Sequence, residues 1–437
     1  MDDAKMPEAM QQSPLGLRMR TVLHHLRTGA RELSDDEFAL IWTTNNPRFP
    51  LYRSRFADWS KRLGDFRVTG YEQRHTFAGA AIIEDAAGRR SRFNVVLDEN
   101  PPHLILGSAV FPSPPGVIAR EATTDDAAVL RDIESRTPVV VGDDRISYDR
   151  GADYFVGERL MGSVEMFVVE RDGRVLGVSG RAFPEVRIAG KLYKSEYSHR
   201  LRLLPEAQGE GVRGPLNAVA MERGVVLMNV GYVNYGFIAE GNEAALRSME
   251  PQRRWSVGAV RLVLDTRSAA GDVAGRRADP SDAARLVELF NGMHETEEMF
   301  VPFTVASLAA RLEREPAAYS WSNILLTERA ALGIWPARLG VHRDSKGVVT
   351  DDVRALVLDY GCEPGAESEL VALTRSACKR LGEQGTTELS IFSSSPACGF
   401  DDLNALAKRA EPYVVMCWTP PGPDLEQRGV YVDQLYF

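Results

Sequence analysis

The first 115 residues change from a helical to a strand-like pattern of apolar positions. Apolar side chains recur at helical spacing over 18–63, where Ser34 and Glu37 form a capping box ahead of the apolar run FALIW. Four apolar or alternating runs follow over 66–112, separated by turn sequences such as DAAG at 85–88. This pattern predicts helices followed by four strands, which together make a small α+β domain.

A proline-rich segment closes this domain. Residues 112–116 read PSPPG, a sequence that can continue neither a strand nor a helix. We therefore place a domain boundary at residue 115. The order of the elements in 1–115 is similar to that of cystatin- and NTF2-like domains.

An internal repeat follows the boundary. REATTDDAAVL at 120–130 matches RRADPSDAARL at 276–286 in the arginine, the alanine two residues later, the Asp-Ala-Ala core and the final leucine. Each copy predicts a short strand, an acidic helix cap and an amphipathic helix. Because the second copy follows a Gly/Ala-rich linker at 265–275, we predict two similar domains, over 116–265 and 276–437.

A glycine-rich turn in the first copy indicates an anion site. The segment PEAQGEGVRGPL at 205–216 joins an apolar strand to an apolar helix that begins near Val212. Backbone N–H groups at a helix N-terminus bind anions, and Gly209 and Gly211 let the backbone approach a phosphate closely. The absence of a Gly-Lys-Ser/Thr sequence disfavours a P-loop, and the strands that precede the turn disfavour a dinucleotide-binding crossover.

This segment resembles motif A of the GCN5-related N-acetyltransferases (GNAT). That pattern is Gln/Arg-x-x-Gly-x-Gly/Ala after a strand whose exposed backbone pairs with pantetheine. Gln208, Gly211 and Leu216 fall in register with it, whereas Arg213 stands where glycine or alanine is usual.

A second motif of the same family follows in the expected order. In YGFIAEGNEAALRSM at 235–249, Asn242 and Ala245 occupy the family's Asn-x-x-Ala positions. The two motifs imply that acyl-CoA binds through a set of residues on the strand, the turn and the next helix. These are Leu201, Leu203, Leu204, Gln208, Gly209, Glu210, Gly211, Val212, Arg213, Gly214 and Asn242.

The resemblance and the repeat together imply tandem GNAT domains, each a mixed, mostly antiparallel sheet flanked by helices. The second copy lacks the turn motif, because VRALVLDY at 353–360 leads into a helix that starts with Glu367 and Glu369. Carboxylates at a helix N-terminus suit the helix dipole but repel a pyrophosphate. We therefore expect 276–437 to be a degenerate GNAT-like domain and acyl-CoA to bind once per chain.

Acyl transfer to an amine needs a proton acceptor, because an alkylammonium with a pKa of about 10.4 is protonated at pH 7. The strand before the turn offers Glu196 and His199, which lie on opposite faces because they are three residues apart. Glu240 is a third candidate, and the resemblance favours a glutamate. The carboxylate of Phe437 is a fourth candidate, and a purely structural role competes for each.

The general acid is less well defined. The family usually places a tyrosine on the helix after the Asn-x-x-Ala motif, and this position is Met249 here. Tyr235, Tyr232 and Tyr197 are the alternatives, or the thiolate leaves unaided, since a thiol pKa of about 8.5 makes it a tolerable leaving group.

Composition narrows the classes of partner. The 437 residues are 44% hydrophobic and carry a formal net charge of −9, which disfavours a general nucleic-acid binder. No apolar run approaches the roughly 20 residues of a membrane span, so we expect a cytoplasmic protein without a membrane partner. We expect no metal, because the sequence HETEE at 294–298 lacks the second histidine of a zinc helix and the cysteines lack CxxC spacing.

We predict an N-acyltransferase that transfers an acyl group, in the first instance from acetyl-CoA, to a primary amine of a small molecule or peptide. Loops at 134–150 and 293–304 are the expected acceptor-binding segments. Two alternatives stay open. The first is an enzyme of natural-product or peptide modification that transfers a longer acyl group, carried either by CoA or by the phosphopantetheine of an acyl carrier protein. The second is a non-catalytic protein that binds acyl-CoA or a protein partner. A homodimer is compatible with the sequence.

Overall fold

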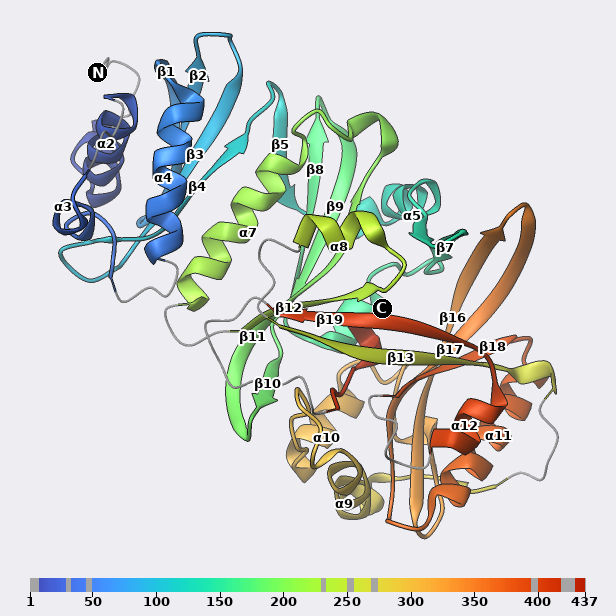
Figure 1. The fold of residues 1–437 in the computed structure, drawn as a ribbon. Coiled ribbons are helices and arrows are strands. Elements are labelled where there is room, and N and C mark those ends of the chain that lie inside the picture. Colours follow the sequence, from blue (N-terminus) through green and yellow to red (C-terminus); the bar gives the residue numbers. More distant parts are fainter. Residues whose placement is uncertain are drawn as a thin grey trace. The chain divides into compact units, whose positions relative to one another are not determined.

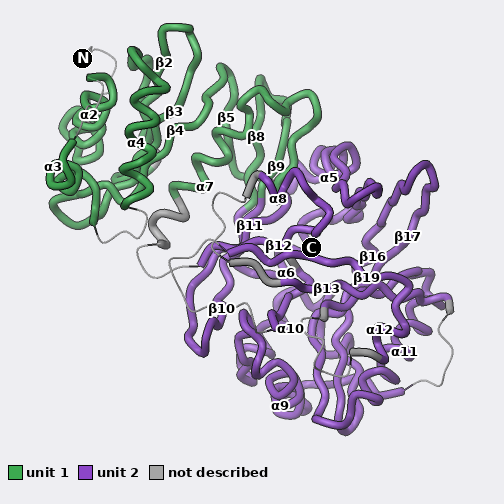
Figure 2. The backbone as a smooth tube through the Cα atoms, in the orientation of Figure 1, with its two compact units in different colours: residues 1–122, 166–179, 201–232 green, residues 123–165, 180–200, 233–437 purple. Residues whose placement is uncertain are grey.

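The structure is a computed structural model that describes residues 8–28, 33–44, 49–228, 233–249, 255–268, 274–393, 400–417 and 429–436. The chain forms two compact units (Figure 2). The first unit comprises 1–122, 166–179 and 201–232, and the second comprises 123–165, 180–200 and 233–437. This division runs through the middle domain expected from the sequence, so the boundaries at 115 and 265 stay predictions.

The first unit begins with helices and then a four-stranded sheet (Figure 1). The helices are α1 (Glu8–Gln11), α2 (Pro14–Arg27), α3 (Asp35–Ala39) and α4 (Phe49–Leu63). The strands are β1 (Phe66–His75), β2 (Ala78–Asp85), β3 (Arg90–Leu97) and β4 (Ile105–Pro112), paired antiparallel in chain order. The Ser34–Glu37 capping box is present, and the order of helices and strands agrees with the prediction. The likeness to cystatin- or NTF2-like domains stays a prediction.

Both faces of this sheet are covered. Phe93 and Val95 of β3 belong to a core that includes side chains of α2 and α4. Val96, which points to the opposite face because side chains alternate along a strand, packs with Leu106 and with Met221. Met221 lies on α7 (Arg213–Met228), so the helix that follows the glycine-rich turn covers the second face of the N-terminal sheet.

The remaining strands of the first unit lead to this turn. β5 (Val117–Glu121) pairs antiparallel with β8 (Val164–Arg171), and β9 (Arg174–Ala182) and the end of β11 (Lys191–Leu203) follow. A short 3-10 helix, η3 (Pro205–Ala207), then connects β11 to the turn and to α7.

The second unit holds the rest of the first copy. Its elements are α5 (Ala127–Arg136), β6 (Val139–Val141), β7 (Asp144–Asp149), α6 (Val156–Met161), β10 (Glu185–Ile188), most of β11, β12 (Val233–Ala239) and α8 (Glu243–Met249). β11 and β12 pair in parallel from Ser195↔Val233 to Tyr197↔Tyr235, and Arg200 then adopts a positive φ of 51°. A residue with this backbone conformation interrupts the regular strand just beyond the paired segment.

The second copy lies entirely in the second unit. The first copy ends with β13 (Trp255–Asp265), which also lies in this unit. The elements of the second copy are β14 (Arg276–Arg277), α9 (Ala283–His294), α10 (Val305–Glu313), β15 (Ile324–Leu326), β16 (Ala330–Ser345), β17 (Val348–Cys362), α11 (Glu367–Glu383), β18 (Glu388–Ser393), α12 (Phe400–Leu406) and β19 (Ala407–Cys417). In this unit the strand order is β14-β15-β16-β17-β18-β13-β19-β12-β11. β19 therefore lies between β12 and β13, and it pairs antiparallel with both.

The internal repeat has a structural counterpart. The matching segments form equivalent turns with capping boxes, Thr123 with Asp126 in the first copy and Asp279 with Asp282 in the second. β17 and β18 pair in parallel from Arg354↔Glu388 to Leu356↔Ser390, as β11 and β12 do in the first copy. Each parallel pair is joined through a helix, as a parallel connection requires.

Candidate functional site

The glycine-rich turn has a defined conformation in the first unit. The Gln208 side-chain amide donates to the Leu203 carbonyl oxygen at 3.1 Å, which closes the turn on the end of β11. Gly209 and Gly211 have φ values of 81° and 74°, a region that favours glycine. Leu204 and Val212 are buried on either side of the turn and anchor it to the core.

The backbone of this turn presents free donors. In the described part of the chain, the N–H groups of residues 209–212 have no hydrogen-bond acceptor, and α7 begins at Arg213. N–H groups that converge at a helix N-terminus carry a partial positive charge and bind anions. The turn can therefore hold a phosphate group, as its sequence predicts.

Charged side chains around the turn have partners within the protein. Glu210 forms an ion pair with Arg171 at 3.0 Å, so its carboxylate is neutralised. Arg213, half-buried, donates through Nε to Asn217 at 3.2 Å, and burial lowers the pKa of its guanidinium. Leu201 and Leu203 are half-buried on β11, and Gly214 is buried in the first turn of α7.

Asn242 has a structural role in the second unit. Its Oδ1 accepts from the Ala245 N–H at 3.2 Å, and its carbonyl oxygen accepts from Leu246 at 3.0 Å. These bonds make it the N-cap of α8. Met249 is the last residue of this helix, and Tyr232 and Phe437 lie outside the described residues.

The candidate base Glu196 is held in a buried ion pair. Its side chain is fully buried, and it pairs with Arg181 of β9. A carboxylate that is paired away from solvent is poorly placed to exchange a proton with a substrate. Glu240, in contrast, is exposed in the turn after β12, where its N–H donates to the Pro412 carbonyl oxygen at 3.0 Å.

His199 is a buried and neutral imidazole. Its ring stacks on Tyr197 with centroids 5.5 Å apart, and neither ring nitrogen has a hydrogen-bond partner in the described part of the chain. Burial lowers the pKa of His199 well below its usual range, and the guanidinium groups of Arg200, Arg150 and Arg181 lower it further. The ring is therefore uncharged at neutral pH.

This lowered pKa predicts a pH-dependent stability. Below about pH 6.5 the unfolded chain protonates His199 while the folded chain does not, so the free energy of unfolding should fall by up to about 1.4 kcal/mol per pH unit as the pH decreases. His199→Phe keeps a ring on Tyr197 and removes the titration, so this variant should lose that part of the slope. Urea unfolding between pH 5 and pH 7 measures both proteins, and equal slopes would contradict the prediction.

Tyr235 connects this strand to a large pocket. Tyr197 lies 5.3 Å from both Tyr235 and Phe237, measured between ring centroids. Tyr235 and Phe237 in turn line a pocket of about 410 Å³ in the second unit. Contacts between aromatic rings therefore connect His199, through Tyr197, to Tyr235 and Phe237 in the pocket wall.

The pocket is mainly aromatic and apolar. Its lining residues are Met161, Ser163, Phe183, Pro184, Glu185, Val186, Tyr235, Phe237, Met299, Phe300, Val301, Phe303, Ser307, Arg311, Arg314, Tyr431, Asp433 and Leu435. The segment 293–304, expected from the sequence to bind the acceptor, contributes to the wall, and 134–150 contributes none of these residues. No periodicity or motif marks the other lining residues, because they come from segments far apart in the chain.

A fixed ionic group forms part of this pocket. Arg311 of α10 contacts Asp433 at 2.9 Å and Asp359 at 3.1 Å. Tyr319 donates its hydroxyl to Asp359 at 2.7 Å, and burial raises the pKa of the Asp359 carboxyl. The guanidinium is thus held in place before any ligand arrives.

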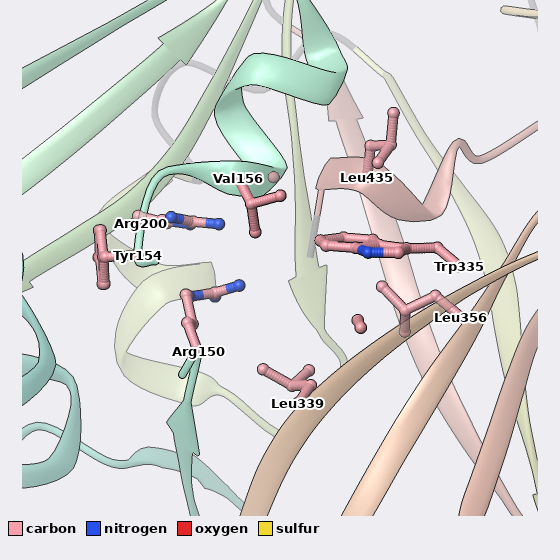
Figure 3. Close-up of a pocket in the computed structure, with 10 residues that line it drawn as sticks. Arg150, Tyr154, Val156, Arg200, Trp335, Leu339, Leu356 and Leu435 are labelled. Atoms are coloured by element: carbon pink, nitrogen blue, oxygen red, sulfur yellow. The ribbon is translucent and has the colours of Figure 1, made fainter. Parts of the chain in front are cut away.

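A second, much smaller cavity lies beside α6 (Figure 3). Arg150, Tyr154, Arg200 and Trp335 line it, and its volume is about 20 Å³, which suits a single water molecule. Arg150 pairs with Glu134 at 2.9 Å, and Arg200 pairs with Glu158. This cavity is therefore lined by arginines that are already ion-paired, and it is too small for a substrate.

In the described part of the second copy, the segment that precedes α11 (residues 361–367) differs from the open turn. The N–H of Gly365 donates to the Glu367 carboxylate at 3.1 Å, so the start of α11 carries its own anion. Beyond the parallel pairing of β17 and β18, Gln434 donates from Nε2 to the carbonyl oxygens of Val357 and Ser390, both at 2.8 Å. A side-chain amide thus bridges β17 and β18, and the degeneracy expected for this copy stays a prediction.

The histidine of HETEE at 294–298 is bonded to other protein groups in the described part of the chain. His294 has both ring nitrogens bonded within the protein, to Glu297 at 2.6 Å and to the Tyr360 carbonyl oxygen at 3.0 Å. Among the described residues, no group of three His, Cys, Asp or Glu side chains is arranged to hold a metal ion. No described helix has the length and apolar character needed to cross a bilayer.

Comparison with known proteins identifies the fold. The sequence matches no protein-family model and no curated protein. A structure of Saccharomyces cerevisiae N-myristoyltransferase with bound myristoyl-CoA is 10% identical with a TM-score of 0.52, over 77% of this chain and 87% of that one. A second structure of that enzyme, with myristoyl-CoA and inhibitors, is 11% identical with a TM-score of 0.51, over 77% and 89%.

Structures of GCN5-related N-acetyltransferases are also similar, with TM-scores below those of N-myristoyltransferase. A GCN5-related N-acetyltransferase from Sphaerobacter thermophilus is 17% identical with a TM-score of 0.44, over 71% of this chain and 98% of that one. At these identities the N-myristoyltransferase matches show the fold alone. The chain shares the fold of N-myristoyltransferase over 77% of its length, and the predicted mixed, mostly antiparallel α+β fold is confirmed, whereas the domain boundaries and the nature of the N-terminal domain stay predictions.

Proposed function

We propose that the protein is an N-acyltransferase that moves an acyl group from an acyl-CoA thioester to a primary amine. The observation that carries this proposal is the turn at 208–214, whose free N–H groups precede α7 in a chain with the fold of N-myristoyltransferase. The solved structures of that enzyme contain myristoyl-CoA. An acyl-CoA supplies an activated carbonyl carbon and a thiolate leaving group.

The turn would hold the pyrophosphate of the cofactor. The N–H groups of residues 209–212 provide the donors, and Arg171 and Arg213 are the cationic side chains on and beside the turn. Leu201 and Leu203 would flank the pantetheine arm, and Gln208 keeps the turn closed on β11. The second copy supports one cofactor per chain, because Glu367 and Gln434 already satisfy the equivalent backbone groups.

The large pocket would take the amine acceptor. Its volume of about 410 Å³ suits a small molecule or a short peptide, and its aromatic walls favour an amine attached to an apolar or aromatic body. Tyr235, Phe237 and Tyr431 can also hold an ammonium group through cation–π contacts before it loses its proton. The ionic group of Arg311 and Asp433 would orient the polar part of the acceptor.

None of the three candidate bases is among the described residues that line the pocket, and the His199 ring is buried behind Tyr197. The neutral ring can accept a proton, whereas Glu196 is paired with Arg181 and Glu240 is exposed after β12. In the reaction the amine nitrogen bonds to the carbonyl carbon and the carbon–sulfur bond breaks, while water in the pocket takes the amine proton and Tyr235 or water protonates the thiolate.

Two measurements on the purified protein test this function. Calorimetry with acetyl-CoA and with myristoyl-CoA should give one site per chain, because only the first copy has the open turn. Release of free thiol should then accelerate when tyramine, phenethylamine and short peptides with apolar first residues are added. No binding of either donor would refute the proposal, and binding without thiol release for any amine would favour a non-catalytic acyl-CoA-binding protein.

The length of the acyl group and the nature of the carrier are part of the same test. Myristoyl-CoA is included because the fold neighbours bind it. A carrier-protein donor and a homodimer stay predictions, to be tested with acyl-phosphopantetheine and by sedimentation.

A further inference from the structure

The N-terminal sheet contacts α7 through a buried polar bond. Asn94 of β3 donates from Nδ2 to Oε1 of Glu222 at 2.6 Å, and both side chains are buried. Such a bond to a charged acceptor in a low-dielectric interior is strong and directional. Met221, next to Glu222, adds an apolar contact with Val96 and Leu106 on the same face of the sheet.

The end of β4 contacts the glycine-rich turn itself. A Cβ atom at Gly214 would lie 1.9 Å from the Pro112 carbonyl oxygen, and one at Gly211 would lie 2.6 Å from the Pro112 side chain and 3.5 Å from that of Pro114. The glycines therefore allow the proline segment to lie directly against the turn. The segment PSPP is conformationally restricted, so it presents a stiff surface to these glycines.

These two contacts hold α7 at separate points. Gly214 and Glu222 are eight residues apart in the same helix, which corresponds to roughly 12 Å along its axis. Both contacts come from the N-terminal sheet, Asn94 from β3 and Pro112 from β4. A helix fixed at two points cannot rotate or slide without breaking one of them, so the direction of its N-terminal N–H groups is fixed as well.

We propose that the N-terminal sheet is a working part of the acyl-CoA site, in which Asn94 and Pro112 are positioning residues for the 208–214 turn. This inference rests on the proposed function of that turn. The free N–H groups of residues 209–212 bind an anion well only if they are already aimed, because ordering them on binding would cost affinity. The sheet in 1–115 would thus serve the cofactor site.

A reciprocal pair of substitutions tests the Asn94 contact. Asn94→Asp places two carboxylates against each other, and we expect about a tenfold weaker affinity for CoA. Adding Glu222→Gln restores a hydrogen bond with donor and acceptor exchanged, so the double variant should regain most of the affinity. Glu222→Gln alone keeps the original Asn94 donor and is the matched control. Affinities come from calorimetry with CoA, and thermal melting shows that each variant is folded.

A measurement on the unmodified protein makes the test independent of variant folding. Hydrogen exchange of β4 and of residues 113 and 116–117 should slow several-fold when CoA is added, whereas β1 should change little, because only the former contact the turn. If Asn94→Asp binds CoA like the wild type, or if CoA leaves the exchange of β4 unchanged, the contact is structural and this inference is wrong. If the wild type does not bind CoA, the proposed function fails first and this inference fails with it.

Discussion

Gly209→Asp is expected to weaken acyl-CoA binding on the order of 100-fold. A Cβ atom at Gly209 meets no other atom within 4 Å, and aspartate tolerates a positive φ better than most residues, so the variant should fold. The new carboxylate would lie beside the free N–H groups of 209–212 and repel the pyrophosphate. Two charges about 4 Å apart near a protein surface interact by a few kcal/mol, which is enough for this loss.

The control for this substitution is Gly209→Asn. Asparagine has the same shape and the same tolerance of positive φ, but it carries no charge, so most of the affinity should remain. Gly211→Asp is a poorer test, because a side chain there would collide with Pro112 and disturb the fold. Calorimetric titration with CoA compares the two Gly209 variants, and equal affinities would place the pyrophosphate elsewhere.

Arg181→Leu is expected to lower the free energy of unfolding by about 3–5 kcal/mol, the usual cost of leaving a buried charge without its partner. Glu196 is fully buried, and Arg181 is largely buried beside it. The guanidinium therefore compensates a carboxylate that water cannot reach. Removing it forces Glu196 to stay charged at high cost or to take up a proton.

The double variant Arg181→Leu, Glu196→Leu distinguishes this structural role from a catalytic one. It removes both charges, so it should recover most of the stability lost in Arg181→Leu. Urea unfolding of the single and double variants gives the comparison. A single variant within about 1 kcal/mol of the wild type, below the usual cost of a broken buried pair, would show that Glu196 exchanges protons freely and would return it to the list of candidate bases.

Local sequence determined the elements that depend on a few neighbouring residues. The turn at 208–214 was predictable because positive φ values need glycine and a helix N-terminus supplies unpaired N–H groups. The capping boxes at Thr123 and Asp279 were also predictable. In each of them, the two residues that exchange hydrogen bonds are only three positions apart in the sequence. The acidic first turn of α11, with Glu367 and Glu369, is likewise set by local sequence, and the prediction that the second copy binds no pyrophosphate rests on it.

Only the tertiary structure decided which of the candidate residues lie together. Glu196 and His199 were both candidate bases in the sequence, with the resemblance favouring the glutamate. Packing gave Glu196 a buried Arg181 and gave His199 a ring stack, with no hydrogen bond to either ring nitrogen in the described part of the chain. The pocket wall joins β12, α10 and the segment that contains Tyr431, and the N-terminal sheet packs on α7 through Asn94. Such contacts depend on how segments far apart in the chain pack against one another, and neither periodicity nor turn chemistry carries that information.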